Sequence, residues 1–196
     1  YNREDMWRFP NELYEGNERQ MDPYYLIMRL PEEPKEEFLL FLPFTPVNKN
    51  NMISWLAGRS DGEHYGKLIL YEFPKQELIY GPMQIEARID QDTDISELLT
   101  LWDQQGSRVI RGNLLVIPIE EALLYIEPVY LRSDQGQMPE LRRVIASYEN
   151  KIVMRRDLET SLAAIFGEAE EAPVVEQVQA PGPGQQVIKQ LNIPEL

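Results

Sequence analysis

The apolar segments of this chain are short, and turn residues separate them. The two longest, residues 38–44 and 114–119, each contain a proline. A helix that crosses a membrane needs about 20 consecutive apolar residues, so neither segment predicts a membrane span. Short apolar runs between Pro, Gly, Asn and Asp are typical of β-strands. The sequence therefore predicts a fold built largely from strands.

The first predicted strands are residues 24–30 and 38–44, joined by a charged turn that contains Pro31 and Pro34. This arrangement predicts a hairpin. The second strand is apolar on both of its faces, so we expect both faces to be covered. Further strands are predicted at residues 67–73, 78–80, 83–89, 109–110, 113–119, 123–131, 142–148 and 151–154.

Short helices are predicted where a capping residue precedes apolar residues at helical spacing. The segments are residues 51–58 after Asn50 or Asn51, residues 95–105 after Asp94, and residues 158–167 after Asp157. Asp94 and Glu97 together have the form of a capping box. Strands in runs of two or three, with helices between the runs, indicate an α+β fold: an antiparallel-rich mixed sheet with three or four short helices.

Composition divides the chain into four parts. Residues 1–23 are polar with scattered aromatics and predict an irregular segment, and residues 24–167 predict one α+β globular domain. Residues 168–186 are rich in Pro, Gly and Glu and predict a linker. Residues 187–196 are the start of a further element or a tail that docks. The first residue is Tyr1, and we expect that a preceding part of the protein is missing.

The charge balance excludes some partners. The chain has 33 acidic and 19 basic residues, a net charge of −14. An acidic body repels phosphate backbones and anionic headgroups, so we expect neither nucleic acid nor direct lipid binding. The chain contains no cysteine, which excludes disulfides, thiolate metal sites and cysteine nucleophiles.

A polar glycine-rich loop at residues 59–66 contains Asp61 and His64, the only histidine of the chain. Titratable groups on flexible backbone suit general acid–base chemistry, and a triad of Ser60, Asp61 and His64 is conceivable. However, residues so close in sequence rarely point at one another. A loop between a helix and a strand is polar and glycine-rich without any function, which is the more economical interpretation.

Asp90, Asp92 and Asp94 alternate as the first ligands of a calcium loop do. The EF-hand pattern then requires Gly and Glu where this chain has Ile95 and Leu101, so that match fails. An irregular Ca²⁺ site remains open as one hypothesis, and no other cofactor is expected. The alternative is that these residues end a strand and cap the helix that follows.

Two arginines, Arg108 and Arg111, lie beside Gly112. The planar guanidinium suits carboxylate or phosphate groups, so the pair could hold an anionic ligand. In a chain this acidic, internal ion pairs are the preferred interpretation. The sequence has no phosphate-binding glycine loop and no GxSxG or HExxH motif.

Several longer strings resemble the bacterial family known as uncharacterised protein family 0182. They are EFLLFLPFTP at residues 37–46, NMISWLA at 51–57, YGPMQ at 80–84, ARIDQD at 87–92, RVIRGNL at 108–114 and IFG at 165–167. The resemblance runs from about residue 24 to residue 167. It implies an integral membrane protein of the cell membrane with several N-terminal transmembrane helices and a large extracytoplasmic region, of which this chain is a C-terminal part.

The resemblance assigns no activity, so it transfers no functional residues. We expect an extracytoplasmic domain with a binding, assembly or structural role, whose partners are the membrane part and other segments of the same parent protein. An extracytoplasmic hydrolase or Ca²⁺-dependent enzyme is the alternative, using the 61–64 loop or the 90–94 cluster. An enzyme requires these side chains to converge in a pocket, whereas a binding module predicts separated side chains and an exposed apolar patch.

Overall fold

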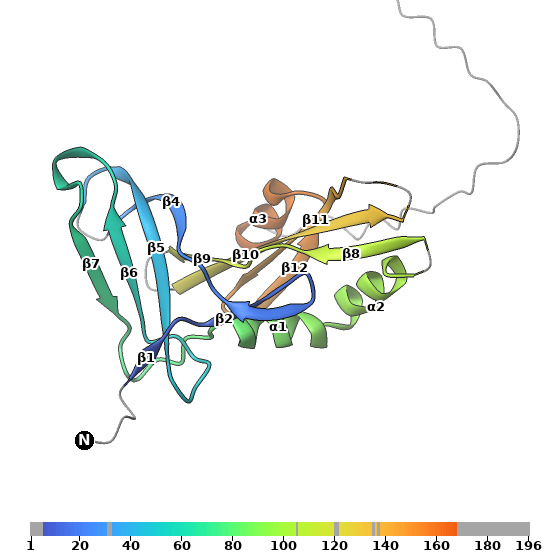
Figure 1. Ribbon diagram of the computed structural model, residues 1–196, viewed down its shortest axis with the longest axis horizontal. Helices are drawn as coiled ribbons and strands as arrows, with labels where there is room; N and C mark the ends of the chain where they lie inside the picture. The colour runs from blue at the N-terminus through green and yellow to red at the C-terminus, as the bar shows by residue number, and fades with distance from the viewer. Residues whose placement is uncertain are drawn as a thin grey trace, which may run out of the picture.

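The computed structural model describes residues 6–30, 33–104, 106–119, 122–134, 136 and 138–167. Two five-stranded sheets, a separate two-stranded hairpin and three α-helices make up this part of the chain (Figure 1). Every strand pair in it is antiparallel. The predicted α+β class with antiparallel pairing is confirmed. None of the helices in the described residues combines the length and the apolar character that a membrane crossing needs.

The first sheet is built around its longest strand, β5. One edge of β5 pairs with β6, which in turn pairs with β7, and the other edge pairs with both β4 and β1. The strands are β1 (Trp7–Arg8), β4 (Tyr24–Arg29), β5 (Glu36–Pro46), β6 (Ser54–Arg59) and β7 (Leu68–Glu72). The predicted hairpin of residues 24–30 and 38–44 is confirmed as β4 and β5, with Ile27 opposite Phe38.

The second sheet is built around β10, which pairs with β11 on one edge and with β8 and β9 on the other. Its strands are β8 (Ser107–Arg111), β9 (Leu115–Ile119), β10 (Ala122–Ser133), β11 (Glu140–Tyr148) and β12 (Lys151–Arg155). Glu149 takes a positive φ of 53° in the turn between β11 and β12. The predicted strands 142–148 and 151–154 are confirmed as the hairpin of β11 and β12, with Tyr148 opposite Lys151.

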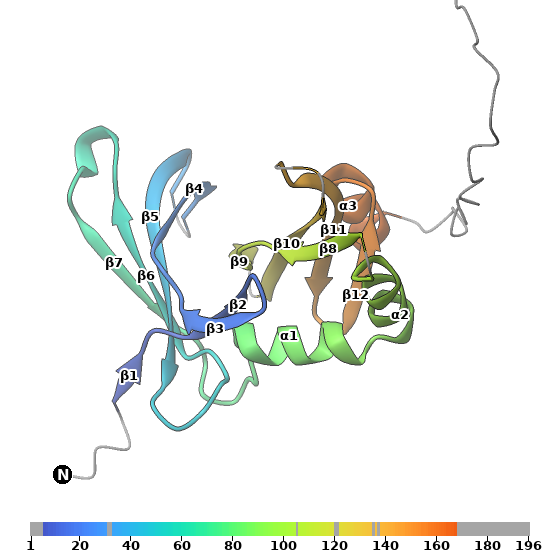
Figure 2. The same cartoon turned by 45° about the vertical axis from the view of Figure 1, so that its right-hand side comes forward.

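Helices α1 (Pro82–Gln91) and α2 (Thr93–Trp102) follow one another below the second sheet, and hairpin β2 (Asn11–Tyr14) and β3 (Asn17–Gln20) lies beside α1 (Figure 2). One buried apolar cluster joins these parts: it includes Phe41 and Trp55 from the first sheet, Ile85 from α1, and Val116 and Ile145 from the second sheet. Burial of such side chains contributes about 1.5–3 kcal/mol each, so this cluster holds the two sheets together.

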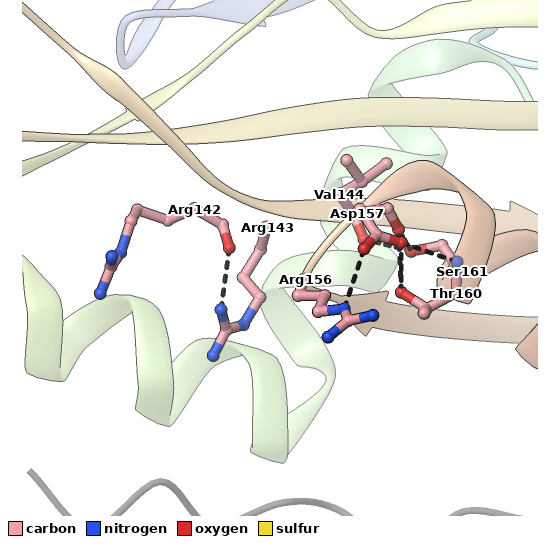
Figure 3. Close-up of polar contacts among 7 residues, drawn as sticks. All are labelled: Arg142, Arg143, Val144, Arg156, Asp157, Thr160 and Ser161. Carbon is pink, nitrogen blue, oxygen red and sulfur yellow. Dashed lines mark hydrogen bonds and ion pairs between the residues drawn. The ribbon is translucent and has the colours of Figure 1, made fainter. Parts of the chain in front are cut away.

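Helix α3 (Leu158–Phe166) packs against β11 and β12. Figure 3 shows how its first turn is fixed: Thr160 N donates to Asp157 Oδ1 at 2.8 Å, and Ser161 Oγ donates to the Val144 carbonyl of β11 at 2.9 Å. The predicted cap by Asp157 is confirmed. These hydrogen bonds with Thr160 lower the pKa of Asp157. The predicted linker at 168–186 and the segment 187–196 lie outside the described residues.

Two predicted elements have the wrong type. Residues 51–58, predicted as a helix, contain β6, because this segment is held between β5 and β7 by backbone pairing on both edges. Residues 83–89, predicted as a strand, belong to α1, in which Ile85 and Ile89 are fully buried. A spacing of four fits one face of a helix as well as one face of a strand. Tertiary contacts determined the secondary structure of both segments.

Other boundaries also differ. Residues 78–80 form only an isolated bridge, between Ile79 and Met52, and not a strand. The segment expected to be irregular, 1–23, contains β1 and the hairpin of β2 and β3. Its turn uses positive φ angles at Glu15 and Gly16. Leu13 is the only aliphatic residue of that hairpin, which is why alternation did not reveal it.

Candidate functional site

The predicted catalytic loop does not assemble a triad. Asp61 Oδ2 accepts a hydrogen bond from the Phe38 backbone N at 3.1 Å, and His64 Nδ1 lies 3.0 Å from Lys67 Nζ. Ser60 Oγ donates to the Gly58 carbonyl at 3.2 Å. Each side chain therefore has a local partner that serves the loop between β6 and β7. The loop is therefore arranged as a connection between two paired strands.

The aspartates of the candidate calcium cluster do not converge: two of them have separate partners, and Asp94 lies in the first turn of α2. Asp90 pairs with Arg111, with an Oδ1–Nη1 distance of 2.7 Å. Asp92 caps α2, because its Oδ1 accepts from Ile95 N at 3.0 Å. Asp92 and not Asp94 is therefore the cap, which corrects the predicted capping box. Among the residues with described positions, no group of three acidic or histidine side chains is arranged to hold a metal ion.

Arg108 and Arg111 point in different directions although they lie on the same strand, β8. Arg108 is exposed, whereas only 13% of the Arg111 side chain is exposed. The two do not form a joint anion site. Arg111 takes part in an internal ion-pair network, which was the preferred interpretation of the sequence.

That network joins α1 to β8 and β10. Arg111 Nε and Nη2 donate to the two carboxylate oxygens of Glu127 at 2.5 and 2.8 Å. Nη2 also donates to Glu86, and Nη1 donates to Asp90, one turn further along α1. Glu127 is 0% exposed and Glu86 1%. One arginine thus donates to three carboxyl groups, two of them fully buried.

The network contains three carboxyl groups and one positive charge. Burial raises the pKa of its two buried carboxyl groups. Burial, with the neighbouring Glu127 charge, raises the pKa of Glu86 to about 8. Burial also raises the pKa of Glu127, although its hydrogen bond with Arg111 opposes this. Oε1 of Glu86 is buried and has no hydrogen-bond partner among the described residues, so a negative charge on this carboxyl would be poorly solvated. The raised pKa favours the neutral form of Glu86 near pH 7, while the guanidinium of Arg111 favours the charged form of Glu127.

A third buried carboxyl adjoins this network. Glu12 of β2 is 1% exposed, and its Oε1 accepts from Arg19 Nε at 3.0 Å. Arg19 also donates to Asn113 Oδ1 at 3.3 Å. Burial raises the pKa of Glu12. Sequence reasoning missed Glu12, Glu86 and Glu127. The one available signal was Glu127, a charged residue in the middle of an apolar strand.

The raised pKa of Glu86 should make the free energy of unfolding depend on pH. The folded state holds this proton up to about pH 8, whereas an unfolded glutamate releases it near pH 4.3. Between these values the folded state binds more protons, so the contribution of Glu86 to stability is present at low pH and is lost as pH rises.

We expect Glu86→Gln to remove this pH-dependent loss of stability. The measurement is urea unfolding from pH 5 to pH 8.5: the stability difference, variant minus wild type, should grow with pH. A difference independent of pH would show that Glu86 is ionised throughout.

The second feature is an exposed apolar face on the first sheet. Paired positions along β4, β5, β6 and β7 place the same face of each strand outward, as in the row Tyr25–Leu40–Gly58–Leu68. The outward apolar residues are Tyr25, Ile27, Phe38, Leu40, Leu42, Phe44, Leu56, Leu68 and Leu70. We call this set the outer face. Charged outward residues occur only toward the strand ends, at Arg29, Glu36 and Glu72.

The outer face is open within the described part of the chain. Ile27 is 73% exposed, Leu68 70% and Tyr25 61%. Trp7 and Phe9 pack on Phe44 at one end, with ring centroids 5.8 and 5.5 Å apart. The other face of the sheet turns toward the core and the second sheet (Figures 1 and 2). The expectation that β5 is covered on both sides is therefore met on one side only.

Comparison with known proteins decides the family. The model of an uncharacterised protein family, UPF0182, matches residues 1–102. The chain is 65% identical over 175 residues to a UPF0182 protein of Trichodesmium erythraeum, a match that covers 89% of the chain. It is 61% identical over 181 residues, 92% of the chain, to a UPF0182 protein of Pelotomaculum thermopropionicum. The chain belongs to the UPF0182 family.

The UPF0182 chain is shorter than its relatives. The matched region covers 19% of the Trichodesmium protein and 20% of the Pelotomaculum protein. The chain therefore spans about a fifth of the length of these curated relatives. No solved structure matches it significantly. The family resemblance noted in the sequence is confirmed.

Three surface and interior features of this UPF0182 chain can be compared. A shallow depression along α2 is lined by Ser96, Glu97, Thr100 and Leu101 and contains none of the predicted site residues. The Arg111 network is buried and internally paired. On the outer face, Ile27, Leu68 and Tyr25 are more than half exposed.

Proposed function

We propose that this UPF0182 chain is an interaction domain that docks on other parts of its parent protein through the outer face. The single observation that carries the proposal is the exposure of Ile27, Leu68 and Tyr25 on adjacent strands of one sheet. An antiparallel sheet with one solvated face normally alternates apolar and polar residues. Here the outward positions are apolar across four strands, as expected of a sheet that is covered on both faces.

The free energy involved is large enough to hold a domain in place. Burying one Leu or Ile side chain contributes about 1.5–3 kcal/mol. The outer face has nine apolar residues, of which several are half-exposed or more. Clustered apolar patches rimmed by polar residues mark protein–protein contacts on soluble domains. Single exposed leucines elsewhere, such as Leu78, carry no such meaning.

We further propose that the parent is a multi-span membrane protein and that this domain lies outside the cytoplasm. The family resemblance supports this location of the domain. The role is assembly or support of the membrane part. The alternative of a hydrolase or a Ca²⁺-dependent enzyme finds no favouring observation, because Asp61, His64 and Asp92 each have a separate local partner.

A cysteine-labelling experiment tests both halves of the proposal. The chain has no cysteine, so Met138→Cys or Leu68→Cys gives this domain a single thiol. Each variant of the full-length protein is exposed to a membrane-impermeant maleimide on intact cells. Met138 is 83% exposed and lies away from the outer face. We expect Met138→Cys to react and Leu68→Cys to react at least about tenfold more slowly, because a buried thiol is shielded.

The outcomes separate the two claims. A Met138→Cys protein that reacts only after the cells are lysed would place the domain in the cytoplasm. Equal rates for the two cysteines would mean that the outer face is open to solvent in the complete protein. The unsubstituted parent protein provides the background.

A further inference from the structure

The free edge of β7 has backbone groups without partners in the described chain. Arg59 N donates to the Lys67 carbonyl at 2.9 Å, and Phe73 N donates to the Ile53 carbonyl at 2.9 Å. Hydrogen-bonded pairs alternate with non-bonded pairs in an antiparallel ladder. The odd-numbered residues of β7 therefore bond to β6. The N–H and C=O groups of Leu68, Leu70 and Glu72 point away from the sheet.

This edge lacks the features that normally prevent strand addition. Edge strands are protected by proline, bulges, central charges or a covering element. β7 has no proline, its pairing with β6 runs without a bulge from Ser54–Glu72 to Gly58–Leu68, and its first four residues are Leu, Ile, Leu and Tyr. β7 is also the outermost strand of the sheet in both views (Figures 1 and 2).

The edges of the second sheet differ. Helix α3 packs on β12, and α2 packs beside β8. β12 carries Lys151 and Arg155 at its ends, and β8 carries Arg108 and Arg111. At the other edge of the first sheet, Tyr24 of β4 is tied to β9 by two hydrogen bonds with the Val116 backbone, at 2.6 and 3.0 Å. The β7 edge therefore differs from these three.

We propose that β7 accepts one further strand, supplied by a segment of the same polypeptide outside this chain. The inference rests on the proposed function, because the added strand would continue the outer face beyond Leu68 and Leu70. Main-chain hydrogen bonds to Leu68, Leu70 and Glu72 fix its register. Its side chains alternate, with apolar residues on the side of the outer face.

The occupant is argued from length and charge. The matched relatives are about five times longer than the chain, so most of the polypeptide is available to supply the strand. A segment of the same polypeptide acts at a high effective concentration. A second copy of this chain would bring a further net charge of −14 to the contact, and like charges repel. The same polypeptide is therefore favoured over a second copy.

Amide hydrogen exchange on the full-length protein tests the inference. We expect the amides of Leu68, Leu70 and Glu72 to exchange on the order of 100-fold or more slowly than unpaired amides. The amides of Ile69 and Tyr71 bond to β6 and serve as the internal control, since they are protected in either case. The protection should be the same at two protein concentrations that differ tenfold.

Each other result overturns the inference. Free exchange at Leu68, Leu70 and Glu72, with Ile69 and Tyr71 protected, would leave the edge open. If the Leu68 side chain were nevertheless shielded, the outer face would be docked without strand addition, and the proposed function would stand alone. Protection that rises with protein concentration would assign the edge to a second copy.

Discussion

Arg111→Met is expected to destabilise the protein by about 3–5 kcal/mol, the loss typical of breaking a buried ion pair by removing one partner. Arg111 is the common donor to Glu127, Glu86 and Asp90. Methionine preserves much of the apolar volume of the side chain, so the loss reports charge and hydrogen bonds more than packing. Without the guanidinium, Glu127 is 0% exposed and has no counter-ion, so its carboxylate must stay unpaired or take up a proton, and either outcome costs stability.

Arg108→Met is the matched control. It is the same substitution on the same strand, at an exposed position, and surface substitutions of this kind usually change stability by less than about 0.5 kcal/mol. Urea unfolding monitored by circular dichroism measures both variants. If Arg111→Met lost no more stability than Arg108→Met, the network would have no structural role.

A second variant separates the charge effect from misfolding. Combining Arg111→Met with Glu127→Gln removes the unpaired charge, so part of the lost stability should return. Replacing both partners of a buried pair costs less than removing one of them. A double variant as unstable as the sum of the two single variants would contradict this account.

The fold class and the hairpins could be predicted because their signals are local. Turn residues and alternation mark β4 with β5 and β11 with β12. Residues 51–58 and 83–89 were assigned the wrong type because short apolar runs fit either period. Pro82, at the first turn of α1, was a usable helix signal.

The Arg111 network could be predicted only in part. The sequence favours internal ion pairs for Arg111, but it does not identify Glu86 and Glu127, which lie on different elements brought together by tertiary packing. The sequence likewise did not predict the hydrogen-bond and ion-pair partners of Asp61, His64, Asp90 and Asp92. The sequence did indicate that β5 is apolar on both faces. In the structure, one of these faces is buried in the core and the other belongs to the exposed outer face.

The largest expected change on going from this chain to the complete protein is the loss of solvent from the outer face. Leu68 is 70% exposed and Leu78, outside that face, is 67% exposed. The two leucines therefore have equal intrinsic reactivity and nearly equal access in this chain. A partner that buries the outer face should shield Leu68 and leave Leu78 unaffected by that contact, because interface cores exclude water.

Hydroxyl-radical footprinting of the unsubstituted full-length protein measures this difference directly, with mass spectrometry to read the oxidation of each leucine. We expect Leu68 to be oxidised at least about tenfold more slowly than Leu78, in keeping with the water-free core of a docked interface. Oxidation of both leucines at the same rate would contradict the account, because the outer face would then remain in solvent in the protein to which it belongs.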